Sequence, residues 1–242
     1  MSTPDSPIAV LTGASSGVGE AIALGLAELR ATLCLIGRHL PALEAVGRAC
    51  RARGAQYRCY RADLALDHEV EQLADRILQD VPGVDILVHA AGAIRRGPIE
   101  QASAQELDLQ YRTNVRAPYV LTQGLLRPLK ARQGQVVFVN STAGLAARAG
   151  VGPYAASKHA LKAVADSLRE EVNASGIRVL SLFLGRTATP MQAAVHGWEG
   201  RPYRPELLIQ PQDVAAVALH ALSLPRNVEV TDIRMRPMAK SY

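Results

Sequence analysis

The stretch Thr12-Gly13-Ala14-Ser15-Ser16-Gly17-Val18-Gly19 decides the fold, because it joins a short apolar run at 8–12 to a helical pattern that starts at Gly17. Glycines at such a turn let the backbone bend tightly and approach a pyrophosphate at the N-terminus of the helix. A glycine-rich turn by itself also suits an ordinary connection between a strand and a helix. Its place after the first strand of an alternating chain favours a dinucleotide site.

Short apolar runs alternate with longer helical patterns along the whole chain. The predicted strands are 8–12, 32–37, 56–61, 84–89, 135–140, 178–184 and 228–234. The predicted helices are 17–30, 40–53, 67–80, 103–132, 153–174 and 211–223. Most runs are rich in aliphatic and β-branched residues without strict alternation, which is typical of strands buried on both faces. The pattern predicts one α/β domain over residues 1–242, with a parallel sheet and helices on both of its faces.

Length and composition exclude several classes of protein. The chain has 242 residues, of which 48% are hydrophobic, and this is enough to bury a sizeable core. No apolar run reaches the length of a membrane helix, and the first residues do not resemble a secretory signal, so we expect no membrane association. Three cysteines without motif spacing argue against a disulfide framework and against a metal site. We therefore expect a reduced, cytoplasmic compartment.

The basic charge does not indicate nucleic acid. The formal net charge is +5, from 23 arginines and 4 lysines against 22 acidic residues. The basic residues are scattered, and no basic stripe interleaved with aromatic residues occurs. A solvated surface with a mild basic excess explains this composition, so we expect no nucleic-acid partner.

The end of the second predicted strand bears on the choice of cofactor. In dinucleotide sites an acidic residue about 20 residues after the glycine-rich turn binds the ribose 2′-hydroxyl of NAD. Here the strand ends in Gly37-Arg38-His39, with no carboxylate. A guanidinium suits a 2′-phosphate, so the pattern predicts NADP(H) with Arg38 as its phosphate ligand. The alternative for Arg38 is an ordinary surface arginine. Ser15, Ser16 and His39 could add contacts.

Two further strand ends would border the cofactor. Asp63 and Leu64 follow the third strand and would lie beside the adenine ring, although Asp63 could instead be a helix cap. Ala91 and Gly92 follow the fourth strand, where small residues allow the cofactor to lie close. His89, which has no acidic neighbour in the sequence, is interpreted as a packed or capping residue.

The strongest chemical signal is the combination of Ser141, Tyr154 and Lys158. Ser141 follows the fifth strand, and the tyrosine and lysine are four residues apart on one face of the next helix. A phenol has an ordinary pKa near 10, so a nearby ammonium and the positive nicotinamide would have to stabilise its phenolate. A Y-x-x-x-K pair alone is common by chance, but its combination with Ser141 and the glycine-rich turn is not.

With these residues, the sequence resembles the short-chain dehydrogenase/reductase family, in its compact form of about 250 residues. The matching motifs extend over most of the chain: T-G-x-x-x-G-x-G at 12–19, Asp63, A-G at 91–92, Asn114, Ser141, Tyr154, Lys158 and G-x-x-x-T at 185–189. The resemblance implies a doubly wound, Rossmann-type, seven-stranded sheet and NAD(P)-dependent interconversion of an alcohol and a carbonyl compound. It also implies a homodimer or homotetramer.

The same resemblance assigns roles. Tyr154 would be the general acid/base, Ser141 would hold the substrate oxygen, and Lys158 would bind the nicotinamide ribose and lower the pKa of the tyrosine. Asn114 would position a water that passes protons on from Lys158. The cofactor would be held by Gly13, Ser15, Ser16, Gly17, Val18, Gly19, Arg38, Asp63, Leu64, Ala91, Gly92, Tyr154, Lys158, Gly185, Thr187 and Thr189.

Two positions depart from the family pattern. Ala90 replaces the asparagine that usually precedes A-G and ties the central strands together, which puts local rigidity in doubt. Leu184 replaces the proline of the P-G pair after the sixth strand, while Gly185 is kept. Neither departure touches the four residues with a catalytic role.

The substrate is less well defined. An irregular segment, 186–210, would form one wall of the substrate pocket with His196, Trp198 and Tyr203, opposite 93–96 and 142–151. Arg95, Arg96, Arg148 and Arg186 would favour an anionic group, unless they are surface or inter-subunit residues. We expect a small or medium carbonyl or alcohol substrate. The alternative is a non-catalytic regulatory protein that only binds a dinucleotide.

One prediction follows from helix geometry without the family. Asn114 lies inside the predicted helix 103–132, and Pro118 is four residues after it. Proline has no N–H, so the carbonyl of Asn114 would lack its intrahelical donor and the helix would kink there. We expect that carbonyl to bind a water shared with the amine of Lys158. The alternative is that Pro118 only bends the helix to fit its neighbours.

Overall fold

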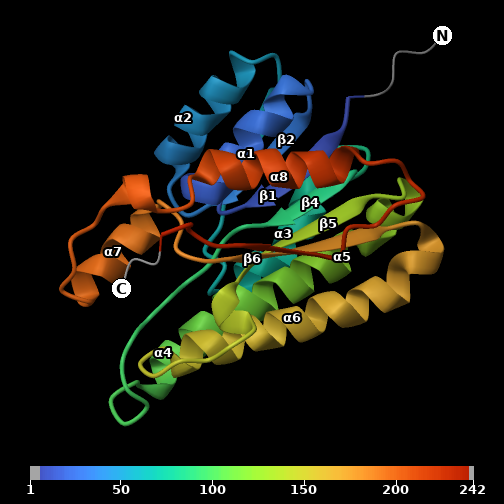
Figure 1. Ribbon diagram of the computed structural model, residues 1–242. Helices are drawn as coiled ribbons and strands as arrows, with labels where there is room; N and C mark the ends of the chain where they lie inside the picture. The colour runs from blue at the N-terminus through green and yellow to red at the C-terminus, as the bar shows by residue number, and fades with distance from the viewer. Residues whose placement is uncertain (1–5, 240–242) are drawn as a thin grey trace.

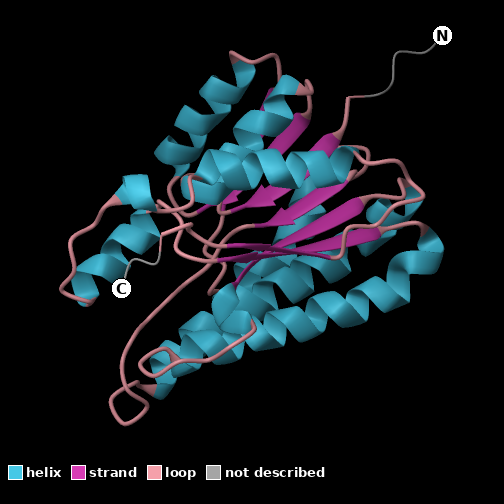
Figure 2. Ribbon diagram, in the orientation of Figure 1, coloured by secondary structure: helices cyan, strands magenta, loops and turns pink. Residues whose placement is uncertain are grey.

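The computed structural model describes residues 6–239, and a parallel seven-stranded sheet runs through them (Figures 1 and 2). The order of strands across the sheet is β3-β2-β1-β4-β5-β6-β7, and every pair of neighbours is parallel. The strands are β1 Ile8–Thr12, β2 Thr32–Gly37, β3 Gln56–Arg61, β4 Ile86–His89, β5 Gln135–Ser141, β6 Arg178–Leu184 and β7 Asp232–Met235. This order confirms the predicted doubly wound, Rossmann-type α/β fold.

Helices cover both faces of the sheet. The α-helices are α1 Gly17–Glu28, α2 Leu40–Arg51, α3 Asp67–Asp80, α4 Ala104–Tyr111, α5 Ala117–Ala131, α6 Gly152–Val172, α7 Pro190–Trp198 and α8 Pro211–Ser223. Helices α1, α2 and α8 lie on one face and α3, α5 and α6 on the other (Figure 1). The aliphatic strands are buried between these two layers, as the lack of strict alternation predicts.

The sheet reverses its order between β1 and β4, and this reversal places the site. Strands β2 and β3 extend the sheet to one side of β1, while β4 to β7 extend it to the other. At such a switch point the loops that follow the two central strands separate, and a crevice opens at the carboxyl edge. Here the turn after β1 meets the turn after β4, because a Cβ on Gly13 would lie 2.6 Å from the backbone nitrogen of Ala91.

The predicted helix 103–132 is interrupted, as the position of Pro118 predicts. It consists of α4, a π-helical turn at Arg112–Arg116 and α5. The N–H of Ala117 donates to the carbonyl of Arg112, five residues back, and Pro118 has no N–H to offer Asn114. The π-helical turn therefore lies next to the position where Pro118 removes a donor. Ser103 and Glu106 form a capping box at the start of α4.

The last strand begins later than the sequence predicts. Residues 228–231 have strand-forming composition, but β7 covers only Asp232–Met235. The N–H of Val179, which a longer ladder would use, donates instead to the Glu229 carboxylate at 2.9 Å. The Arg178 guanidinium also donates to the carbonyl of Val228, at 2.9 Å. The side chains of Glu229 and Arg178 thus take the place of the first backbone hydrogen bonds between β6 and β7.

The segment 186–210 is also more regular than expected, because it contains α7. The Thr189 hydroxyl caps this helix by accepting from the N–H of Gln192 at 3.2 Å, and Pro190 occupies its first turn. A short 3₁₀ turn, Pro205–Leu207, follows. The prolines and glycines of this segment suggested irregular structure. The pair Thr189-Pro190, however, is typical of the start of a helix, and α7 begins there.

Candidate active site

A cleft of about 1000 Å³ opens at the carboxyl edge of the sheet, and most of the predicted site residues line it. Those that do are Gly13, Ser15, Ser16, Gly17, Val18, Arg38, Asp63, Leu64, Ala91, Gly92, Ser141, Tyr154, Lys158, Gly185, Thr187 and Thr189. Two predicted residues, Gly19 and Asn114, do not line the cleft and lie behind it. A cleft of this volume is at the upper end of the range for small-molecule sites.

The glycine-rich turn has no room for larger residues. Gly13 and Gly17 have φ of +66° and +60°, in the left-handed region that favours glycine. A Cβ on Gly19 would lie 2.3 Å from the carbonyl oxygen of Gly13, so the first turn of α1 packs directly beneath the loop. Gly19 therefore shapes the turn, and its own atoms are not part of the cleft wall.

The end of the cleft beside β2 carries Arg38. This residue is exposed and has no carboxylate next to it at the strand end. A Cβ on Gly37 would lie 3.5 Å from Ser15 Oγ, so the glycine-rich turn and the end of β2 form one surface. A group bound on the turn would thus reach a serine hydroxyl and an arginine together.

Asp63 lines the cleft and organises the loop after β3. Its Oδ1 accepts from the N–H of Ala65 at 3.0 Å, and its own N–H donates to Glu69 Oε2 at 2.9 Å. Helix α3 starts at Asp67 with Leu66 as its N-cap. Asp63 therefore caps a turn and not the helix, and the helix-cap alternative is wrong.

Thr12 ties the two central strands together at the position where the family asparagine is replaced by Ala90. Its Oγ1 accepts from the backbone N–H groups of Ala90 and Ala91, each at 3.2 Å, and contacts the carbonyl of Val88 at 3.4 Å. A side chain of β1, Thr12, thus joins β1 to the residues after β4.

Tyr154 and Ser141 meet at the opposite end of the cleft. Ser141 ends β5, and its Oγ accepts from the N–H of Ala143 at 3.1 Å. Tyr154 lies in the first turn of α6. Burial raises the pKa of its phenol, and a hydrogen bond with Ser141 offsets this only in part. The phenol is therefore protonated at neutral pH in this structure.

Lys158 is buried next to Tyr154, with 4% of its surface exposed. Its Nζ donates to the carbonyl of Val139 at 3.1 Å and lies 5.9 Å from the centroid of the Tyr154 ring. Burial lowers the pKa of the ammonium to about 8. Burial is the largest effect on the Tyr154 phenol here, so the lowering of its pKa by Lys158 stays a prediction.

Asn140 is a site residue that was not predicted from the sequence. Its Nδ2 donates to the carbonyl of Lys158 at 3.1 Å, and its Oδ1 accepts from the N–H of Ser141 at 2.7 Å. The side chain is buried and joins the end of β5 to α6, which fixes the serine relative to the lysine. The sequence signal that could have indicated it is the position of Asn140, a lone amide near the end of the mostly aliphatic strand β5.

Asn114 has a side chain fully engaged in structure. Its Oδ1 accepts from the N–H of Ala93 at 2.7 Å, and its Nδ2 donates to the Ala93 carbonyl and to Ser157 Oγ, each at 2.9 Å. It therefore links the loop after β4 to α6. Only its main-chain carbonyl, which lacks an i+4 donor because of Pro118, is left for a role in proton transfer.

His89 is a packed residue, as interpreted from the sequence. It is 2% exposed, its Nε2 lies 2.8 Å from Thr122 Oγ1, and its ring stacks on Phe138 at 5.0 Å. Burial lowers its pKa to about 3, so the ring is neutral. Among residues 6–239, no group of three or more His, Cys, Asp and Glu could hold a metal ion, and no helix is long and apolar enough to cross a membrane.

The proposed substrate segment contributes unevenly to the cleft. Trp198 lines it, whereas His196 and Tyr203 do not. His196 is a buried residue of α7, with its ring in edge contact with that of Tyr203 at 5.4 Å. Arg95, Arg96, Arg148 and Arg186 all line the cleft, as expected.

Comparison with known proteins agrees with this geometry. Residues 7–200 match the family model described as short chain dehydrogenase. An oxidoreductase from Staphylococcus epidermidis is 27% identical over 96% of this chain and 97% of its own.

Two solved structures are similar over nearly the whole chain. An alcohol dehydrogenase from Thermococcus sibiricus complexed with 5-hydroxy-NADP has a TM-score of 0.87 and 26% identity, covering 96% of this chain and 97% of that one. A short chain dehydrogenase from Shigella flexneri complexed with NADP has a TM-score of 0.86 and 30% identity, covering 94% and 96%. With the family model matching most of its length, the chain belongs to the short-chain dehydrogenase/reductase family of oxidoreductases.

Proposed function

We propose that this protein is an NADP(H)-dependent oxidoreductase that interconverts a small or medium carbonyl compound and its secondary alcohol, with reduction as the main direction. The observation that supports this most directly is that Ser141, Tyr154 and Lys158 line the same cleft as the glycine-rich turn. A protonated Tyr154, hydrogen-bonded to Ser141, is the form needed to give a proton to a carbonyl oxygen.

The cleft fits a dinucleotide phosphate. Gly13 and Gly17 line the cleft where α1 begins, and the free N–H groups at that helix N-terminus suit a pyrophosphate. Arg38, with no carboxylate beside it, suits a 2′-phosphate. Similar proteins were solved with NADP or NADPH, which supports the same preference here. When bound, the reduced cofactor supplies the hydride that is added to the carbonyl carbon.

The residues of this chain would perform the remaining steps. Ser141 and Tyr154 would both hydrogen-bond the carbonyl oxygen and hold the carbon toward the nicotinamide. As the hydride reaches the carbon, the proton of the Tyr154 hydroxyl passes to the oxygen, which gives the alcohol and a phenolate. The Lys158 ammonium would stabilise that phenolate and hold the ribose hydroxyls.

The proton is then restored to Tyr154. We propose a route through Lys158 and a water held by the main-chain carbonyl of Asn114, the group that Pro118 leaves without a donor. The lowered pKa of Lys158, about 8, suits a group that gives up and regains a proton near neutral pH.

The surroundings of the protein are proposed on different grounds. Ile99, Leu107 and Tyr111 are exposed apolar side chains, the last two one turn apart on α4, and they support a homodimer or homotetramer.

Cys34, Cys50 and Cys59 are all unpaired thiols, which supports a reducing compartment such as the cytoplasm. We propose that residues 1–242 act as one domain, with 186–210 as the substrate segment.

The test is turnover of NADPH with a panel of aldehydes and ketones, by wild type and by Tyr154→Phe. The variant keeps the ring but loses the transferable proton, so we expect turnover to fall by about 10²–10⁴-fold with NADPH binding little changed. Retention of more than about a tenth of the activity would exclude this mechanism. NADPH binding by wild type without turnover of any carbonyl compound would instead favour a dinucleotide-binding regulator.

A further inference from the structure

The substrate end of the cleft is lined by an excess of positive charge. Its charged side chains other than Lys158 are five arginines and one glutamate: Arg95, Arg96, Arg148, Arg186, Arg201 and Glu199. Asp63, the other acidic residue in the cleft wall, follows β3, at the end where Arg38 lies. A recess lined by one sign of charge concentrates ions of the opposite sign.

The arginines come from two walls. Arg95 and Arg96 follow β4, and Arg148 lies in the loop between Ser141 and Tyr154. These two loops are joined by a hydrogen bond from the N–H of Gly97 to the carbonyl of Gly150, at 3.0 Å. The other wall is the segment 186–210, which supplies Arg186 and Arg201.

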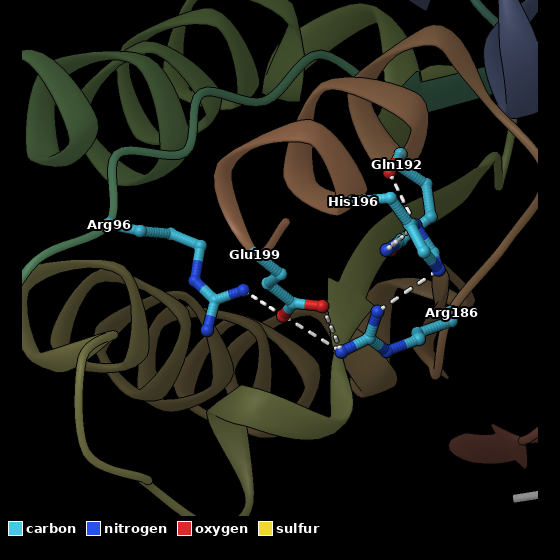
Figure 3. A network of polar contacts seen from close by, with 5 residues as sticks. All are labelled: Arg96, Arg186, Gln192, His196 and Glu199. Carbon is cyan, nitrogen blue, oxygen red and sulfur yellow. Dashed lines mark hydrogen bonds and ion pairs between the residues drawn. The ribbon is translucent and has the colours of Figure 1, made fainter. Parts of the chain in front are cut away.

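Glu199 does not cancel this charge, because two of the arginines share it (Figure 3). Both of its carboxylate oxygens lie 2.8 Å from Arg186 Nη2, and Arg96 Nη1 bonds the same carboxylate from the opposite wall. Burial raises the pKa of Glu199, but the two arginines together outweigh it and lower the pKa, so the group stays ionised. One carboxylate between two guanidiniums leaves a net positive charge and holds the two walls together.

A buried histidine fixes the orientation of Arg186. The guanidinium Nη1 donates to His196 Nε2 at 3.3 Å, and His196 Nδ1 lies 2.9 Å from the carbonyl of Gln192, which sets the Nδ1–H tautomer (Figure 3). The arginine follows Gly185 at the end of β6. Its guanidinium is therefore held at the cleft wall by His196 in α7 and by Glu199, the C-cap of that helix.

The remaining arginines have no acidic partner. Within residues 6–239, the side chains of Arg148 and Arg201 make no hydrogen bond or ion pair, and Arg95 bonds only the neighbouring carbonyl of Ile94, at 3.0 Å. Their donors are free to bind a ligand in the cleft. A guanidinium matches a carboxylate or a phosphate in both charge and geometry.

We propose that the carbonyl substrate carries an anionic group, a carboxylate or a phosphate, that binds these arginines away from the reacting carbon. This inference rests on the proposed function and adds the substrate class to it. The anionic group does not react: the hydride and the proton still go to the carbonyl carbon and oxygen. Arg148 and Arg201 would contact the anion, while Arg96 and Arg186, paired with Glu199, would form the fixed wall behind it.

The test uses three aldehydes that share a benzaldehyde ring and differ in charge. Two are anionic, 4-carboxybenzaldehyde and 4-formylphenyl phosphate, and the third is the neutral ester methyl 4-formylbenzoate. Comparison of their kcat/KM values should show that wild type prefers at least one anion by about tenfold or more, because a hydrogen bond to a charged group contributes that much to binding. The two anions distinguish a carboxylate site from a phosphate site.

The variant Arg148→Gln/Arg201→Gln should lose this preference. We expect its kcat/KM to fall at least about tenfold for the anion, mainly through KM, while the value for the neutral ester changes little. Arg127→Gln, on the exposed side of α5, is the matched control and should change neither value. NADPH affinity, measured by its fluorescence, should be the same in all three proteins.

Three results would overturn the proposal. They are a wild type that prefers the ester, a double variant that loses the anion and the ester equally, and a double variant whose main defect is NADPH binding. In each of these cases the enzyme still turns over a carbonyl compound, so the proposed function would stand. Failure to reduce any of the three aldehydes or any member of the broader panel would count against the proposed function itself.

Discussion

Replacement of Lys158 by methionine should make the folded protein more stable while it removes activity. The ammonium is 4% exposed and has one hydrogen bond, to the carbonyl of Val139. Burial lowers its pKa from 10.5 to about 8. A shift of that size corresponds to about 3 kcal/mol of destabilisation at pH 7, since each pKa unit is worth about 1.4 kcal/mol. Methionine has similar length and carries no charge.

The dependence on pH isolates the contribution of the charge. Because the pKa of Lys158 is lower in the folded protein, the unfolded chain binds more protons between about pH 8 and 10.5. The stability of wild type therefore rises with pH in that window, and the penalty falls from about 3 kcal/mol at pH 7 to about 1 kcal/mol at pH 10. Loss of the bond to Val139 costs about 1–3 kcal/mol at every pH, so it cancels in this comparison.

The assay is thermal unfolding of wild type and Lys158→Met at pH 7 and pH 10, followed by circular dichroism. The difference in Tm between the two proteins should shift by about 4–8 °C in favour of wild type as the pH rises, which corresponds to about 2 kcal/mol in a domain of this size. Lys130→Met, at an exposed position on α5, is the control and should show no such shift. A Tm difference that is the same at both pH values, or a Lys158→Met enzyme that keeps its turnover, would refute the reasoning.

The other predictions concern the cofactor and the serine. Gly37→Asp with Arg38→Gln should lower the preference of kcat/KM for NADPH over NADH by about tenfold or more, and a wild type that already prefers NADH would contradict the role of Arg38. Gly19→Ala should abolish NADPH binding in a fluorescence titration and lower the Tm, because the new Cβ would lie 2.3 Å from the carbonyl oxygen of Gly13; unchanged affinity would contradict this account of the turn. Ser141→Ala should lower kcat/KM by about 10²–10³-fold with NADPH affinity unchanged, since it removes one donor to the substrate oxygen. Steady-state kinetics measures this, and a smaller loss of kcat/KM would contradict the role of Ser141.

Local sequence signals were sufficient for most of the elements and for most of the residues that line the cleft. The turn at 12–19 lies between a strand and a helix, as its glycines predict, and Pro118 marks the place where the long helix changes to a π-helical turn. Both depend only on residues close together in the sequence: the glycines allow positive φ angles, and Pro118 lacks an N–H donor. The predicted start of β7 was wrong because it depends on a contact between distant residues. The Glu229 carboxylate accepts from the backbone N–H of Val179, 50 residues away, and so replaces a bond between the strands.

The sequence by itself determined the fold class, the glycine-rich turn and the identity of Ser141, Tyr154 and Lys158 as one group, because spacing along a helix and position after a strand carry that information. The tertiary structure alone decided the electrostatics. It shows that burial raises the pKa of Tyr154 and lowers that of Lys158, and that Glu199 joins Arg96 and Arg186 from opposite walls of the cleft. Burial and ion pairing depend on which distant segments meet, and a linear pattern of residue types does not encode those distances.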